Sequence, residues 1–252
     1  LLFWASITYD TILTSDFAGY LFNSVTLAAL TASAALGLAL FIAYGKRAFP
    51  SNVSRVSARL VGLGYALPGT VVAIGVLVPF AWFDNRLSEF MVANFNYNTG
   101  LLLSGTVFIL VFAYLVRFLP IALNTVDAGL TKIRPSMDEA GRSMGLSPAA
   151  LLRRVHIPIM RGSLATALLL VFVDVLKELP ATLLLRPFNF NTLAIRTFEL
   201  ANEERLADAA GPALAIVLAS LIPVILLSRT LRQAGEAPSS LPQASLPSDE
   251  NR

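Results

Sequence analysis

Cysteine is absent from this sequence, and histidine occurs once. Without cysteine the chain has no disulfides, no thiolate metal sites and no thiol nucleophile. With one histidine and no G-x-S-x-G sequence, it also lacks the parts of the usual hydrolase and metalloprotease sites. No G-x-x-x-x-G-K-[ST] sequence occurs, which excludes nucleotide binding by a P-loop in this chain.

Charged residues are scarce as well. They make up 14% of the chain, against about 25% in soluble domains, whereas 56% of the residues are hydrophobic. The net charge of +3 is small and scattered, so it does not suggest nucleic-acid binding. The composition indicates a chain that lies in lipid.

The apolar residues are gathered in runs long enough to cross a bilayer, which takes about 20 residues in a helix. Arg117 interrupts the third run, where we expect its stem to reach toward the headgroups, and three charged residues interrupt the fourth. Prolines recur inside the runs, as is common in transporters with broken helices: Pro68, Pro79, Pro120, Pro180 and Pro223. We therefore expect an all-α membrane bundle with five transmembrane helices, at residues 21–44, 60–83, 100–123, 164–185 and 211–231.

Basic and acidic loops alternate between the predicted spans. Segment 46–59 has four basic residues and no acid, and segment 124–162 has six basic residues against three acids. The other two loops, 84–99 and 186–210, have more acids than bases. Because cytoplasmic loops carry the Lys/Arg excess, we expect both basic loops and the C-terminus inside, and the N-terminus outside.

The two ends of the chain differ from the middle. Residues 1–19 are expected to form an external segment and the stub of a preceding span of a longer polypeptide. Residues 20–232 form the predicted transmembrane domain. Residues 233–252 are rich in Pro, Ser and Ala without apolar periodicity, which is typical of a disordered cytoplasmic tail.

The second basic loop contains the strongest local signals. Ser136 and Glu139 have the spacing of a capping box, which predicts a helix that begins after Ser136. Gly145 is placed to end this helix in a left-handed conformation. Two short helices joined at Gly145 are too short to be stable alone, so they pack either on the ends of their own spans or on a partner.

The second helix of this loop has its own start and stop signals. Ser147 can cap it, and Pro148 then occupies the first helical position, where proline is tolerated best. Pro158 predicts its end. His156, the one histidine, is interpreted as a solvated or packing residue in preference to a metal ligand.

Asp174, Lys177 and Glu178 lie on one face of the predicted fourth span, at i, i+3 and i+4. Each costs roughly 2.5–3.5 kcal/mol at mid-membrane, so this face must point into protein or water. An Asp174–Lys177 or Lys177–Glu178 pair would neutralise part of the charge. Two interpretations remain open: a structural ion pair, or a translocation path lined by Glu178 and Asp174, with Pro180 opening the backbone beside it.

The loop resembles a known family. Its residues are similar to the E-A-A…G…I-x-L-P loop of type I, binding-protein-dependent ATP-binding-cassette importer permeases, at Glu139, Ala140, Gly141, Gly145, Val155, Ile157 and Pro158. Gly141, Val155 and Ile157 are small departures from that pattern. In that family the loop docks into a cleft of a separate cytoplasmic ATPase.

The resemblance implies partners more than cofactors. ATP would be bound by the ATPase subunit, with no cofactor in this chain. A second permease half, fused or separate, and an extracytoplasmic substrate-binding protein would complete the importer in a bacterial inner membrane. Segment 198–210, with its amphipathic pattern, is interpreted as a short surface helix, either a connector or a docking surface for that binding protein.

The run 176–188 looks like the ferric-iron importers of this class, as do segments 191–194 and 203–206. Many of those permeases are two fused halves, and this chain resembles the second. Fe³⁺ prefers oxygen donors, so Glu178 is a candidate ligand for the transported ion. The alternatives are the same class with thiamine, a polyamine or an anion as substrate, and an ion-coupled secondary transporter with Asp174 and Glu178 as ion carriers; an intramembrane enzyme and a scaffold are disfavoured.

Overall fold

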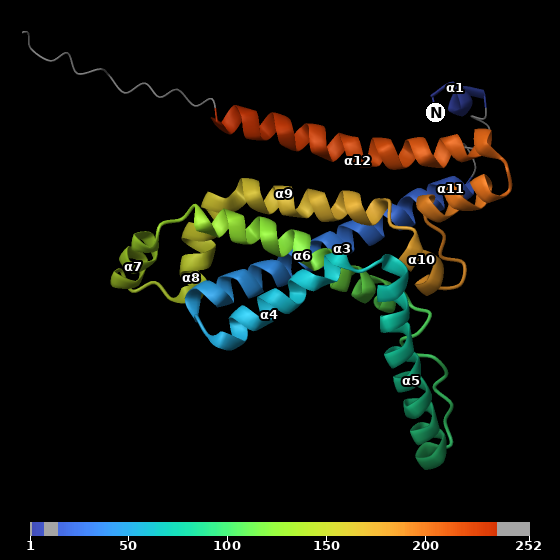
Figure 1. Cartoon of the computed structure of the whole chain (residues 1–252), viewed down its shortest axis with the longest axis horizontal. Coiled ribbons are helices and arrows are strands. Elements are labelled where there is room, and N and C mark those ends of the chain that lie inside the picture. Colours follow the sequence, from blue (N-terminus) through green and yellow to red (C-terminus); the bar gives the residue numbers. More distant parts are fainter. Residues whose placement is uncertain (1, 8–14, 236–252) are drawn as a thin grey trace, which may run out of the picture.

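The computed structural model describes residues 2–7 and 15–235, and within these ranges it contains helices and turns but no strand. Figure 1 shows long helices running beside one another, with short helices at both ends of the bundle. In chain order the elements are α1 (Leu2–Ile7), α3 (Ser15–Ala48), α4 (Asn52–Gly62), η1 (Leu63–Ala66), α5 (Gly69–Phe95), α6 (Val107–Thr131), α7 (Pro135–Ser143), α8 (Pro148–Leu151), η2 (Leu152–His156), α9 (Ile157–Leu176), α10 (Pro180–Leu185), α11 (Leu193–Asn202) and α12 (Leu206–Gly235).

Five helices in the described ranges are long and apolar enough to cross a membrane, which confirms the predicted all-α membrane fold with five spans. The core lies where α3, α6 and α9 pack together. On α3 the residues that face the other two helices are small, and this lets the helix backbones approach closely, as is usual in membranes. They are Ala28, Ala32, Ala35, Ala39 and Ala43, each at most 1% exposed.

The predicted second span, 60–83, is wrong in its bounds. The chain forms α4 and η1, breaks at Leu67 and Pro68, and only then begins α5, which extends to Phe95. Pro68 ends the first segment because its ring disfavours a helical residue before it. Figure 1 shows α4 beside α3 and α6, and α5 leaving the bundle at a steep angle.

The predicted fourth span, 164–185, is displaced as well. The helical stretch that can cross the membrane is Pro148–Leu176, and the expected helix end at Pro158 does not occur. Residues 152–156 form a short π-helix just before Pro158. A π-turn widens the helix by one residue, which accommodates the ring and the missing N–H of Pro158 without ending the helix.

The other predicted spans and the outer segment need smaller corrections. The third span begins at Val107, because residues 100–106 form the turn that precedes α6. Buried Asp84 on α5 anchors this turn by accepting the backbone N–H groups of Leu103 and Ser104 at 3.1 and 2.7 Å. Segment 198–210 is not one surface helix, since α11 ends at Asn202 and α12 begins at Leu206.

The fifth span is part of α12, whose membrane-compatible stretch is Leu206–Ile225. The helix continues to Gly235, past the predicted start of the tail at residue 233. The remainder of the predicted tail, and residues 8–14 of the predicted N-terminal segment, lie outside the described ranges. The division into residues 1–19, 20–232 and 233–252 stays a prediction.

A close approach at Gly64 fixes the broken segment before α5 against α6. A Cβ atom at Gly64 would overlap the backbone oxygen of Val116 on α6. Gly64→Ala should therefore lower the free energy of unfolding by about 1–3 kcal/mol, as other overpacking substitutions do, read as a lower melting temperature in detergent. The matched control is Gly62→Ala, because a Cβ there meets nothing within 4 Å; equal melting temperatures for the two variants would contradict the packing described here.

Candidate functional site

The first short helix of the loop, α7, begins differently from the prediction. Pro135 is its first residue, Arg134 precedes it in an extended conformation, and no side chain caps the helix. The capping box of Ser136 and Glu139 is therefore wrong. Proline at the first helical position sets the start two residues earlier, because it favours an extended residue before it, so Ser136 is already inside the helix.

The end of α7 agrees with the prediction. Gly145 has a φ of +77°, a conformation that glycine adopts without cost. Its N–H donates to Arg142 O at 2.9 Å, and the N–H of Leu146 donates to Gly141 O at 3.0 Å. These two bonds make a Schellman motif, which satisfies the last carbonyls of the helix.

Gly141 explains one departure from the family pattern. A Cβ atom at this position would lie 2.5 Å from Leu151 Cδ1 on α8, so the side chain of Leu151 occupies the space that alanine would need. On the other face of α7, Glu139 and Ala140 are exposed. The helix thus has an inner face that packs on α8 and an outer face that is free in this chain.

The second short helix, α8, begins as predicted. Ser147 Oγ accepts the Ala150 N–H at 3.3 Å, and Pro148 is the first helical residue. Beyond it, Val155 and Ile157 are half-buried and Pro158 is exposed. The helix does not stop there, since η2 joins α8 to α9.

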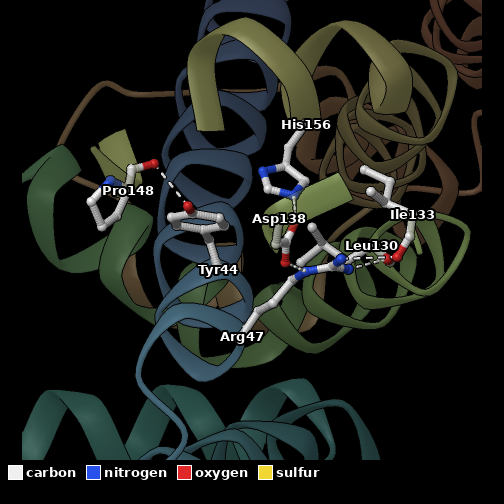
Figure 2. Close-up of polar contacts among 7 residues, drawn as sticks. All are labelled: Tyr44, Arg47, Leu130, Ile133, Asp138, Pro148 and His156. Atoms are coloured by element: carbon white, nitrogen blue, oxygen red, sulfur yellow. Dashed lines mark hydrogen bonds and ion pairs between the residues drawn. The ribbon is translucent and has the colours of Figure 1, made fainter. Parts of the chain in front are cut away.

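A buried polar cluster fastens this loop to the spans, as Figure 2 shows. Arg47, in the last turn of α3, donates through Nε to Asp138 Oδ2 on α7 at 2.7 Å. The other oxygen of Asp138 contacts Nε2 of His156, in η2, at 2.8 Å. The two terminal nitrogens of Arg47 donate to the carbonyl oxygens of Leu130 and Ile133 at the end of α6, the second at 2.8 Å.

Tyr44 of α3 also connects the loop to the spans. Its hydroxyl donates to Pro148 O at 2.7 Å, and its ring lies 5.3 Å from that of His156. His156 is fully buried, so it is a packing residue and not a solvated one. The loop thus packs on the ends of its own spans, and its packing on a partner stays a prediction.

Asp138 stays ionised in this cluster. Burial raises the pKa of its carboxyl group, but hydrogen bonds and charge from Arg47 and His156 outweigh burial and hold the pKa below its usual value. Arg47 and Asp138 could not be recognised as partners from local sequence signals, because they are 91 residues apart. The one available signal was that both loops lie on the same predicted side of the membrane.

A second buried charge centre lies inside the bundle. Arg117 of α6 pairs with Glu178 at 3.0 Å, and Glu178 is 6% exposed. The same carboxylate oxygen accepts the Ala181 N–H of α10 at 3.2 Å. Arg117 therefore does not reach toward the headgroups as predicted. A Cβ at Gly69, the first residue of α5, would lie 2.7 Å from that oxygen, so the ion pair also packs against the start of α5.

The three charges of the predicted fourth span do not share a helix face. α9 ends at Leu176, so Lys177 and Glu178 lie past it. The Asp174–Lys177 pair forms at 2.8 Å, with the Lys177 side chain 63% exposed, whereas Glu178 turns inward to Arg117 instead of Lys177. Pro180 opens α10, whose Thr182 hydroxyl bonds to that of Tyr114 on α6.

No group of three or more His, Asp or Glu side chains within the described ranges is placed to hold a metal ion. Glu178 meets Arg117 and a backbone N–H, and Asp174 meets Lys177. Iron binding by Glu178 stays a prediction, and it would require Arg117 to move away.

Comparison with known proteins identifies relatives of this chain. Residues 35–233 match the family described as Binding-protein-dependent transport system inner membrane component. The Fe(3+)-transport system permease protein FbpB 2 of Haemophilus influenzae is 30% identical over 85% of this chain and 39% of its own length. The putative 2-aminoethylphosphonate transport system permease protein PhnV of Salmonella typhimurium is 24% identical over 86% of this chain and 76% of its own. The chain thus spans about two fifths of FbpB 2 and about three quarters of PhnV.

Two solved structures share the fold. A bacterial ABC transporter that imports the acidic polysaccharide alginate superimposes with a TM-score of 0.69 at 16% identity, over 89% of this chain and 82% of its own. The inward-facing MetNI methionine ABC transporter superimposes with a TM-score of 0.60 at 14% identity, over 85% of this chain and 94% of its own. At these identities the likeness shows the fold alone.

Removing one partner of the buried pair should be costly. Arg117→Met leaves Glu178 buried without a counter-charge and should lower the free energy of unfolding by about 3–5 kcal/mol. Arg117→Met with Glu178→Met should recover most of that loss. Lys177→Gln removes a cation from the exposed pair and should cost at most about 1 kcal/mol.

Thermal unfolding of the four purified proteins, wild type included, measures these differences. If Arg117→Met were no less stable than Lys177→Gln, Arg117 and Glu178 would not form a buried pair.

Proposed function

Because the chain belongs to the family of binding-protein-dependent transport system inner membrane components, we propose that it is the permease subunit of an ATP-driven importer. Its loop, residues 134–158, couples the spans to a separate cytoplasmic ATPase, which binds the ATP. The observation that carries this proposal is the two-sided loop. Asp138 on one face of α7 is hydrogen-bonded to α3 and η2, whereas Glu139 and Ala140 are exposed.

The outer face suits an ATPase surface. Glu139 and Ala140 are exposed on α7, and Gly145 turns the chain so that α8 follows at once. Val155, Ile157 and Pro158 lie past α8, where they join the docking element to α9. A rigid, preformed element of this kind binds without a large cost for ordering.

The proposed orientation places this loop in the cytoplasm, the C-terminus on the same side, and the start of α3 outside. Figure 1 supports it, because α7 and α8 lie at one end of the bundle and α10 and α11 at the other. The last turn of α3, with Lys46 and Arg47, lies at the α7 end, so the two basic loops share one side of the membrane, as the positive-inside rule requires.

For the translocation path, we propose a division of roles among the four predicted residues. Asp174 and Lys177 line a groove of about 420 Å³ between α9 and α12, so their charges can meet a passing substrate. Glu178 and Pro180 instead shape the backbone beside the path, through the contact with Arg117 and the start of α10. Alternating access would then move α9 and α10 against α5.

The complete importer would also contain a second permease half, fused or separate, and an extracytoplasmic substrate-binding protein. A relative of more than twice this chain's matched length supports a fused arrangement, since the match covers 39% of FbpB 2. The exposed apolar side chains of α5, among them Ile74, Val78 and Trp82, would contact lipid or that second half. The family match favours this ATP-driven function over an ion-coupled secondary transporter.

Ferric iron is the proposed substrate, supported by the identity with FbpB 2 and by the oxygen donors that Fe³⁺ prefers. The match to PhnV makes a phosphonate the second candidate. Asp174 and Lys177 pair with each other in the groove, so its charge does not discriminate between the two candidates.

Reversing the charge on the outer face of α7 should break the ATPase contact. Glu139→Lys is expected to reduce co-purification of the partner ATPase about tenfold, or about 1.4 kcal/mol, because it replaces complementary charge with repulsion. The matched control is Glu89→Lys on α5, a comparably exposed acid away from the loop. If Glu139→Lys retained the ATPase as well as Glu89→Lys, the loop would not be the docking element.

The substrate can be tested by uptake. Cells without other ferric importers, supplied with this permease, its ATPase and its binding protein, should accumulate radiolabelled ferric citrate. They should not accumulate radiolabelled 2-aminoethylphosphonate, and Glu139→Lys should abolish iron uptake. Phosphonate uptake without iron uptake would overturn the iron assignment and leave the permease function intact.

A further inference from the structure

The cluster of Arg47, Asp138 and His156, called here the loop lock, connects the end of α3 to α6, α7 and η2, which follow one another much later in the chain. We propose that the loop lock makes α7 and the adjoining ends of α3, α6 and α9 move as one rigid unit, so that displacement of the loop passes directly to three spans. This inference rests on the proposed function for its purpose, since it is the ATPase that would displace the loop. Its physical content, a rigid junction, is independent of the partner and of the substrate.

Asp138 is the centre of the lock because both of its oxygens are engaged. One accepts from Arg47 Nε on α3 and the other meets His156 Nε2 at the start of α9. Arg47 in turn bonds the last carbonyls of α6, at Leu130 and Ile133. Arg47 therefore adds side-chain donors to carbonyls at the C-terminal end of α6 and just past it, where Leu130 O also accepts the Ile133 N–H at 3.1 Å. The Asp138 carboxylate thereby connects α7 directly to α3 and to His156 before α9, and Arg47 extends the connection to the end of α6.

His156 makes the junction intolerant of sliding. Its ring is fully buried, and Nε2 must carry a proton to bond a carboxylate. Nδ1 has no hydrogen-bond partner, so the ring has no second acceptor or donor to turn to if Asp138 moves. The ring is also carried by the π-turn of η2, whose position Pro158 fixes.

The energetics favour two discrete states over gradual movement. Arg47 and Asp138 have side chains only 18% and 14% exposed, so separating them would leave buried charges unpaired. Each lost hydrogen bond to a charged partner also lowers the stability of the folded protein. A force that a partner exerts on the exposed Glu139 acts one residue from Asp138. We therefore expect α7 to shift together with the ends of α3, α6 and α9 before it separates from them.

A neighbouring ion pair supplies the matched control. Lys46, next to Arg47, pairs with Asp127 of α6 at 2.6 Å, and the side chains are 35% and 29% exposed. This pair joins α3 to α6 but does not contact α7 or η2. Asp127→Asn therefore removes a carboxylate from the same region while leaving the lock intact.

Paired spin labels can test the lock, because the chain has no cysteine of its own. Labels at Met144→Cys, 73% exposed at the end of α7, and Thr131→Cys, exposed at the end of α6, report the distance between the loop and a span. The measurement compares wild type, Asp138→Asn and Asp127→Asn in nanodiscs, alone and with the ATPase trapped by ATP and vanadate. Asparagine keeps the shape of Asp138 but offers one acceptor oxygen where the lock needs two.

In wild type and Asp127→Asn the distance distribution should be narrow and should stay within about 2 Å when nucleotide is trapped, the scale of a packing shift. Asp138→Asn should widen the distribution about twofold, since buried partners are left unsatisfied. Arg47→Lys should do the same, because lysine cannot bond Asp138, Leu130 and Ile133 together; it provides the test if Asp138→Asn does not fold.

A distribution as narrow in Asp138→Asn and Arg47→Lys as in wild type would overturn the lock. A large distance change in wild type on nucleotide trapping would overturn it too, since loop and span would then move separately. If the ATPase does not co-purify with wild type, the proposed function fails, but the widths measured without ATPase still decide whether the lock exists.

Discussion

Small side chains on one face of α3 allow α6 and α9 to pack against its backbone, and the positions of the other parts follow from that contact. In lipid, helices gain little from burying apolar surface against one another, so close backbone approach and interhelical polar bonds must hold them together. The alanines from Ala28 to Ala43 provide the approach. The polar bonds lie at two levels, with Arg117 and Glu178 inside the bundle and Arg47 with Asp138 at its end.

These two charge centres explain how an all-helical bundle can contain broken helices. Where α9 ends, Glu178 accepts the N–H of Ala181 and pairs with Arg117, so the interrupted backbone finds partners within the protein. At the other end, Arg47 donates to carbonyl oxygens at the C-terminal end of α6, and the helix continues from the π-turn through Pro158 without a break. The backbone break after α9 thus lies beside a charged pair that satisfies it.

Local signals in the sequence predicted the number of spans, the glycine turn at Gly145 and the Ser147 cap, because each depends on a few neighbouring residues. They did not predict the break at Pro68, which falls within an uncharged run, or the helix that continues through Pro158. The charge partners were also missed, since Arg117 and Glu178 are 61 residues apart and Arg47 and Asp138 are 91. A single sequence contains no information on such pairing, so the exposed pair of Asp174 and Lys177 was foreseen and the buried pairs were not.

Two adjacent residues of α7 have different surroundings, since Asp138 is bonded to α3 and η2 and Glu139 is exposed. We infer that the outer face of α7 meets an ATPase while the inner face holds the bundle. Hydrogen–deuterium exchange of the permease with and without its ATPase tests it most directly. On ATPase binding, the amides of residues 135–157 should exchange about tenfold more slowly. Exchange in residues 97–106, which connect α5 to α6, should be unchanged. Protection at 97–106 with none in the loop would contradict it.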